Sequence, residues 1–227
     1  MKYIVIGLGN FGSSLAKKLT ELGNEVIGVD RNMEVVEALK EYISHTICLN
    51  CTDTRAVSIL PLKDTDTVII AIGENEGENI MATALMKQMK VNKLISRAVS
   101  PLHETILQTM EVDDIIHAEE ETAERWAKKL NFSGIVDSYE LAGQYNIAEI
   151  LVSREYIGKT LAQIEFPKKH NVLVLSIIKT VTEKNMIGIP RKVKKIQGIA
   201  SAESVLEQGD TLVVYGKIED IKKLVEE

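Results

Sequence analysis

The sequence predicts an α/β protein in which a Rossmann-like, doubly wound parallel sheet is followed by a small α+β domain. Three observations lead to this prediction. A short apolar strand pattern runs directly into a glycine-rich turn, and an amphipathic helix pattern follows at once. Strand and helix patterns then alternate as far as Glu119, after which β patterns dominate. Such alternation is typical of parallel sheets covered by helices.

Six segments of the first part have the apolar, β-branched composition of buried strands. They are residues 3–7, 25–30, 45–49, 67–72, 93–97 and 114–117. Five amphipathic stretches between them are predicted to be helices, namely 13–22, 33–42, 53–60, 75–89 and 101–110. Because crossovers between parallel strands are right-handed, this order predicts a doubly wound sheet.

The remaining chain predicts one connecting helix and a small β-rich module. The helix is expected over 120–130, the strands over 147–152, 172–178 and 211–215, and a closing helix over 218–226. We therefore expect two domains, residues 1–135 and residues 136–227.

The composition limits the classes of function. The 227 residues carry a formal net charge of −6, which argues against nucleic-acid binding. No apolar run reaches the roughly 20 residues that a membrane helix needs, and the N-terminus has no signal-peptide pattern. We expect a cytoplasmic protein that reaches the inner face of the membrane only through a partner.

The glycine turn has the spacing of a dinucleotide-binding loop. Gly7 permits the tight turn out of the strand, Gly9 lets a phosphate approach the backbone, and Gly12 lets the helix pack closely on the sheet. The N–H groups at the helix start suit a phosphate. Asp30 ends the next strand pattern and can accept hydrogen bonds from both ribose hydroxyls.

The two cysteines, Cys48 and Cys51, have a C-x-x-C spacing. A structural zinc site needs four ligands, and the sequence holds no second cysteine pair. We therefore expect Cys48 to be a small core residue of a strand. The four histidines have no metal-ligand spacing and are expected to be structural or solvated.

Several blocks together resemble the cytoplasmic regulatory subunits of bacterial Trk/Ktr-type potassium uptake systems. Such subunits carry an RCK N-domain, which regulates potassium conductance, and an RCK C-domain. The blocks in the N-terminal part are residues 7–12, 29–31, 49–53, 68–73, 95–97 and 116–119. Residues 157–161 and 206–212 resemble signatures of the C-domain.

The resemblance implies an effector site for ATP or ADP, with NAD(H) as an alternative ligand. It places the adenine against Arg31, Asn50 and Thr52, and it leaves room for the ligand at Ala71 and Gly73. It also implies a terminal phosphate near Glu119, where Mg²⁺ can bind with ATP. The residues expected at the nucleotide are Gly7, Gly9, Asn10, Phe11, Gly12, Asp30, Arg31, Asn50, Cys51, Thr52, Ala71, Ile72, Gly73, Arg97 and Glu119.

The resemblance further implies dimers that assemble into a tetramer or an octameric ring beneath a membrane potassium channel or transporter. The nucleotide changes the shape of the ring and thereby gates the channel. In some relatives the C-domain binds cyclic di-AMP, and the matching segment here is 166–171. The apolar residues expected at helix cores or subunit interfaces are Leu102, Ile106, Leu107, Met110, Trp126 and Leu130.

Asn10 departs from the pattern of the related subunits. Related subunits often carry arginine where this chain has Asn10, and a neutral asparagine cannot make a bidentate charged contact with a γ-phosphate. We therefore expect weaker discrimination between ATP and ADP.

The basic run 191–195 is expected to be a solvated loop, or a contact for an anionic ligand or the membrane partner.

Two other functions remain open from the sequence. The fold permits an NAD-dependent oxidoreductase, but no tyrosine is followed four residues later by lysine, and the tail is small for a substrate domain. Arg97 is better suited to a nucleotide or a neighbouring subunit than to a substrate carboxylate. A nucleotide sensor for a partner other than a potassium channel is the other alternative. The primary expectation is a regulator and not an enzyme.

Overall fold

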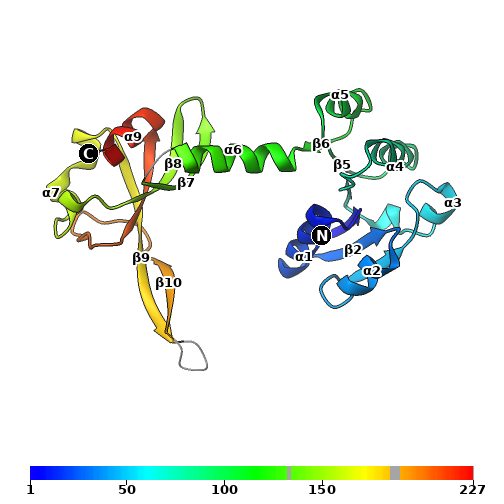
Figure 1. The fold of residues 1–227 in the computed structure, drawn as a ribbon, viewed down its shortest axis with the longest axis horizontal. Helices are drawn as coiled ribbons and strands as arrows, with labels where there is room; N and C mark the ends of the chain where they lie inside the picture. The colour runs from blue at the N-terminus through cyan, green and yellow to red at the C-terminus, as the bar shows by residue number, and fades with distance from the viewer. Residues whose placement is uncertain (132–133, 185–189, 227) are drawn as a thin grey trace. The chain divides into compact units, whose positions relative to one another are not determined.

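The computed structural model describes residues 1–131, 134–184 and 190–226 (Figure 1). The chain forms two compact units, Met1–Glu121 and Thr122–Glu227. Helix α6 (Ala118–Asn131) runs across the division between them. The boundary expected after residue 135 stays a prediction about where two folding domains separate.

The first unit is built on a six-stranded parallel sheet with the strand order β3-β2-β1-β4-β5-β6. Its strands are β1 (Lys2–Ile6), β2 (Glu25–Asp30), β3 (His45–Cys48), β4 (Thr67–Ile70), β5 (Leu94–Arg97) and β6 (Asp114–Ile116). Its helices are α1 (Asn10–Glu21), α2 (Met33–Leu39), α3 (Thr54–Val57), η1 (Leu62–Asp64), α4 (Glu76–Gln88) and α5 (Pro101–Thr109). The order changes direction between β1 and β4, which confirms the doubly wound, Rossmann-like fold.

Helices cover both faces of this sheet, because successive residues of the central strands point to opposite sides. On one face Ile4, Ile6, Val68 and Ile70 pack with Val57 of α3 and Met86 of α4. On the other face Val5 and Ile69 pack with Ala16 of α1 and Leu39 of α2. The continuous apolar composition of β4 follows from this double coverage.

The second unit contains a five-stranded antiparallel sheet with the order β10-β9-β11-β8-β7. Its elements after α6 are β7 (Ile135–Ala142), β8 (Tyr145–Leu151), η2 (Arg154–Tyr156), α7 (Leu161–Ile164), α8 (Phe166–Lys169), β9 (Leu173–Lys184), β10 (Pro190–Ile196), β11 (Thr211–Lys217) and α9 (Ile218–Glu226). Its core joins Ile150, Phe166, Leu206, Leu212 and Ile221. This is the small α+β domain that the sequence predicts.

The expectation of a loop over the basic run 191–195 is wrong, because these residues lie in β10. They pair in antiparallel register with β9, with Arg191 opposite Glu183 and Val193 opposite Val181. The charged side chains remain exposed because β10 is an edge strand. Four of the five residues in this run are basic, so it lacks the alternation of apolar and polar residues by which strands are usually recognised.

The expectation of a core position for Cys48 is also wrong. Its side chain is exposed, and its thiol donates a hydrogen bond to the carbonyl oxygen of Arg31 over 3.4 Å. β3 is one of the two edge strands of the first sheet, so its last residue lacks the cover that a central strand has.

The six apolar residues expected at helix cores or interfaces divide into three groups. Ile106 and Met110 are half-buried. Leu107 is fully buried and belongs to ordinary packing of α5. Leu102, Trp126 and Leu130 instead expose 70%, 52% and 78% of their surface. Single apolar side chains are exposed on most protein surfaces, so the subunit-interface role expected for these three residues stays a prediction.

Candidate functional site

The three glycines of the loop between β1 and α1 have different structural roles. Gly7 has a φ of +91°, and a Cβ there would lie 2.8 Å from Ile72 Cγ1. A Cβ on Gly12 would lie 1.9 Å from the carbonyl oxygen of Gly7, so α1 can approach the strand only with glycine at this place. A Cβ on Gly9 meets no atom within 4 Å. Gly7 and Gly12 are thus required by the fold, whereas Gly9 borders open space.

Gly9 is also the N-cap of α1, and no side chain caps this helix end. The first N–H groups of a helix lack partners within it, and they carry the positive end of the helix dipole. Asn10, the first residue of α1, is exposed. The loop therefore offers hydrogen-bond donors and space to an anionic group.

Asp30 ties the end of β2 to the glycine loop. Its Oδ2 accepts a hydrogen bond from the Leu8 amide over 2.7 Å, and its Oδ1 accepts one from the Asn32 amide over 2.8 Å. Each carboxylate oxygen retains a further lone pair for a ribose hydroxyl. The sequence indicated a ribose contact, but it did not indicate this structural role.

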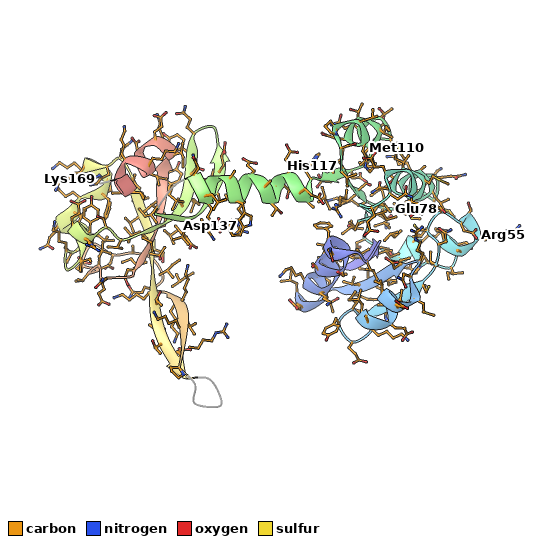
Figure 2. The ribbon with its side chains drawn as sticks, in the orientation of Figure 1. Arg55, Glu78, Met110, His117, Asp137 and Lys169 are labelled. Atoms are coloured by element: carbon orange, nitrogen blue, oxygen red, sulfur yellow. The ribbon has the colours of Figure 1, made fainter. Side chains whose placement is uncertain are left out.

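Arg31 forms an ion pair with Glu78, which lies in the first turn of α4 (Figure 2). The pair joins the carboxyl end of β2 to the helix that follows β4. Burial raises the pKa of the nearby Cys51 thiol, and the Glu78 and Asp30 carboxylates raise it further. Glu78 is a charged residue of this region that the sequence did not single out.

Asn50 and Thr52 form a local turn after β3. Asn50 Oδ1 accepts hydrogen bonds from the Thr52 amide over 3.0 Å and from the Thr52 hydroxyl over 2.8 Å. Asn50 is exposed, and closing a turn through its side-chain oxygen is a common use of asparagine. The structure thus holds these two residues together at the carboxyl edge of the sheet.

The Arg97 guanidinium fills the space beside Gly73 and Phe11. A Cβ on Gly73 would lie 2.6 Å from Arg97 Nη1, and Arg97 Cζ lies 5.3 Å from the centre of the Phe11 ring. Arg97 also forms an ion pair with Glu119. Its side chain is only 13% exposed, and its Nε has no hydrogen-bond partner among the described residues. The room expected at Gly73 is therefore occupied by a cationic side chain.

Asn79 of α4 bridges the carboxyl ends of β4 and β5 by hydrogen bonds. Its Nδ2 donates to the carbonyl oxygens of Ile72 over 2.8 Å and Arg97 over 3.1 Å. Its Oδ1 accepts a hydrogen bond from the Ser96 hydroxyl over 2.9 Å. Asn79 is fully buried, and only this orientation of the amide serves both carbonyls and the hydroxyl. Two segments that carry candidate site residues thus depend on one side-chain amide.

The same amide oxygen extends the network to α5. It lies 3.2 Å from His103 Nε2 and 3.3 Å from the Thr83 hydroxyl. His103 is fully buried, and burial lowers the pKa of its imidazole. Nε2 therefore carries the proton and donates, while Nδ1 has no partner among the described residues. This confirms the structural role expected for His103.

The candidate residues thus gather along one edge of the sheet. Gly7 to Gly12 follow β1, Asp30 and Arg31 end or follow β2, and residues 50–52 follow β3. Ala71, Ile72 and Gly73 follow β4, Arg97 ends β5, and Glu119 lies in the first turn of α6 after β6. Ligands of open parallel sheets bind outside the carboxyl ends of the strands, next to the point where the order reverses.

The sequence matches two known domain families. Residues 3–118 match the TrkA-N domain, and residues 147–227 match the TrkA-C domain. The chain belongs to the TrkA family. This membership confirms the resemblance to Trk/Ktr-type regulatory subunits.

Curated relatives of this TrkA-family chain match it over nearly its whole length. It is 30% identical to Ktr system potassium uptake protein C of Bacillus subtilis strain 168, over 98% of this chain and 95% of that protein. It is 28% identical to Ktr system potassium uptake protein A of the same organism, over 100% and 96%. It is 30% identical to Ktr system potassium uptake protein A of Vibrio alginolyticus, over 95% and 92%.

Solved structures support the same fold for the TrkA-family chain. The GsuK RCK domain aligns over 100% of this chain and 48% of that chain, with a TM-score of 0.64 and 15% identity. A GsuK channel bound to NAD aligns over 98% of this chain and 38% of that chain, with a TM-score of 0.62 and 14% identity. The chain therefore spans less than half of these structural neighbours, and the likeness is one of fold.

Residues 1–131, 134–184 and 190–226 contain no cluster of three His, Cys, Asp or Glu that could hold a metal ion. Over the same ranges, no helix of this TrkA-family chain has the length and apolar composition to cross a bilayer.

Proposed function

We propose that this chain is the cytoplasmic, nucleotide-sensing regulatory subunit of a membrane potassium channel or transporter. Its named relatives are potassium uptake proteins, and its own site has the features of a nucleotide cleft. The nucleotide acts as an effector that changes the conformation of an oligomer, and it is not consumed. The observation that carries the proposal is the open, uncapped N-terminus of α1 at Gly9, next to Asp30.

The chemistry of this site fits an adenine nucleotide or NAD(H). The open space at Gly9 and the amides of α1 accommodate phosphate oxygens. Asp30 has acceptor capacity left for ribose hydroxyls. Arg97 offers a poorly solvated cation with an unpartnered Nε. ADP, ATP and NAD(H) share these phosphates and riboses, and NAD is the ligand named for a GsuK neighbour of the same fold.

Magnesium would enter this site with ATP. Glu119 is a carboxylate beside the cleft and is already paired with Arg97. One carboxylate is too few for a complete Mg²⁺ site, so phosphate oxygens and water would supply the remaining ligands. Mg²⁺ would thus compete with Arg97 for Glu119.

Calorimetric titration with ATP, ADP, NAD⁺ and NADH tests the proposal. We expect tight binding of at least one of these ligands, and nucleotide-dependent ion flux when the chain is added to vesicles that contain its purified transporter. Binding of none of the four would overturn the nucleotide-sensing role. Exclusive binding of NAD(H), together with turnover in a substrate screen, would establish an oxidoreductase instead.

Asn10 sets an expectation for selectivity within this function. Its neutral side chain at the start of α1 offers no second cation to a γ-phosphate. We therefore expect the affinities for ATP and ADP to lie within about tenfold, that is about 1.4 kcal/mol. A hundredfold preference for ATP would contradict this reasoning, and Asn10→Arg is the variant expected to create such a preference.

Assembly and location follow from the same proposal. The exposed Leu102, Trp126 and Leu130 offer apolar surface for a homodimer, and such dimers would stack into a tetramer or octameric ring. Light scattering of the purified chain, with and without nucleotide, measures this state. For cyclic di-AMP, Phe166 of the segment 166–171 is buried in the core against Tyr156 and His170, so only the outer residues of that segment could contact a ligand.

A further inference from the structure

The β9–β10 ribbon of the second unit extends beyond the sheet to which it belongs. β9 pairs with β11 only over Leu173–Ile178, whereas it pairs with β10 as far as Lys184. Six residue pairs therefore lie beyond the last rung shared with β11, which corresponds to about 20 Å of two-stranded ribbon. Figure 1 shows this ribbon reaching away from the remainder of its unit.

The outer strand of the ribbon concentrates positive charge in an otherwise acidic chain. Within β10, Arg191, Lys192, Lys194 and Lys195 are all exposed. Lys195 is paired with Glu183, and Lys194 lies 3.6 Å from Glu149. Arg191 and Lys192 have no carboxylate partner among the described residues. Successive residues of a strand point to opposite faces, so Arg191 and Lys195 lie on one face of the ribbon and Lys192 and Lys194 on the other. We call this strand edge, flanked by cations on both faces, the basic edge; the net charge of the whole chain is −6.

The shape of the basic edge excludes two kinds of occupant. Small anionic ligands bind in concave sites that bury most of their surface, but six of the seven residues of β10 are exposed. A second copy of β10 is excluded because pairing would bring cations against cations, and lysine on edge strands opposes such pairing. An extended, flat anionic surface is what remains complementary to the basic edge.

We propose that the basic edge docks on the anionic headgroups of a lipid bilayer. The commitment to a bilayer rests on the proposed function, which places this chain beside a membrane protein. An isolated two-stranded ribbon is marginally stable in water, so contact with a surface would also order it. Arg191 and Lys192 contribute most, since they lose no intramolecular partner on docking. Each is expected to strengthen binding to an anionic bilayer about fivefold.

Vesicle co-sedimentation of the full chain tests this inference. The vesicles contain phosphatidylcholine alone or an equal mixture with phosphatidylglycerol. We expect the wild type to bind only the mixed vesicles, with binding suppressed as salt shortens the screening length. The variant R191Q/K192Q should bind about 25-fold more weakly. The matched control is K2Q/K40Q, which removes two exposed lysines of the first unit that are paired with Glu25 and Glu37 and should bind like the wild type.

Several results would overturn the inference. They are no binding of the wild type to mixed vesicles, equal binding to neutral vesicles, or the same loss in both variants. If a purified transporter in neutral lipid retains the wild type but not R191Q/K192Q, the partner of the basic edge is an acidic protein surface instead. Nucleotide titration of the same samples separates the two proposals: vesicle binding without nucleotide binding would refute the proposed function and leave the basic edge assigned.

Discussion

Replacing Gly9 with serine should change stability and nucleotide affinity in opposite directions. Gly9 has φ −63° and ψ −168°, which an L-residue adopts without strain, and a Cβ there meets no atom within 4 Å. Serine caps helices better than glycine by a few tenths of a kcal/mol, because its hydroxyl accepts from the uncapped amides of α1. For a chain of this size, the midpoint of thermal unfolding should rise by about 1 °C.

The same hydroxyl should weaken nucleotide binding. It would occupy the amides and the space that we assign to a phosphate, so we expect the dissociation constant to rise at least about tenfold, equivalent to 1.4 kcal/mol. Thermal unfolding by circular dichroism and titration calorimetry measure the two effects. The comparison variant is Gly12→Ala, whose Cβ would lie 1.9 Å from the Gly7 carbonyl oxygen and should lower stability and binding together. Affinity within twofold of the wild type in Gly9→Ser would refute our placement of the phosphate.

Four further predictions concern side chains whose contacts only the structure shows. Asn79→Asp should lower the unfolding free energy by about 3 kcal/mol and weaken nucleotide binding by the folded protein, because a carboxylate cannot donate to the Ile72 and Arg97 carbonyls. Thr65→Val, which loses a buried hydrogen bond before β4, should cost about 1 kcal/mol of stability in denaturant titration and leave binding unchanged. Burial lowers the pKa of His103 in the folded state, so below the ordinary value of 6.5 the unfolded state binds more protons than the folded state. The free energy of unfolding should therefore fall as the pH drops below 6.5, by at most about 1.4 kcal/mol per pH unit. The variant His103→Gln should remove that slope. Glu78→Gln should tighten nucleotide binding by about twofold to fivefold in calorimetry by releasing an exposed Arg31; an unchanged affinity would show that Arg31 does not meet the ligand.

The fold of the first unit could be predicted because each of its strands is short, apolar and followed by an amphipathic helix. β1 and β4 are buried on both sides, so their composition alone marks them as central strands. The glycine loop could also be predicted, because backbone geometry allows only glycine at Gly7 and Gly12. The second unit was harder to predict, because β7 and β10 lie at sheet edges and α7 and α8 span only four residues each.

The site was predicted in its outline but not in its internal pairing. The sequence placed Arg31, Arg97 and Glu119 at the strand ends, yet it could not show that Glu78 and Glu119 hold the two arginines. Ion pairs of this kind join residues far apart in sequence, and periodicity carries no information about them. Asn79 left a usable signal: it is spaced with Ala82, Thr83 and Met86 on the buried face of α4, where an amide needs partners.

On the proposed function, the Arg97–Glu119 ion pair is the place where we expect a bound nucleotide to act at a distance. An effector shifts a conformational equilibrium only by its differential affinity for the two states. A phosphate that contacts Arg97 must compete with Glu119, and Glu119 lies in the first turn of α6, whose later turns expose Trp126 and Leu130. A ligand with a terminal phosphate, or one that brings Mg²⁺ to Glu119, therefore alters the charge balance at the start of this helix. On the proposed function, we therefore expect the number of phosphates, more than the adenine, to be the property of the ligand to which the apolar surface of α6 responds.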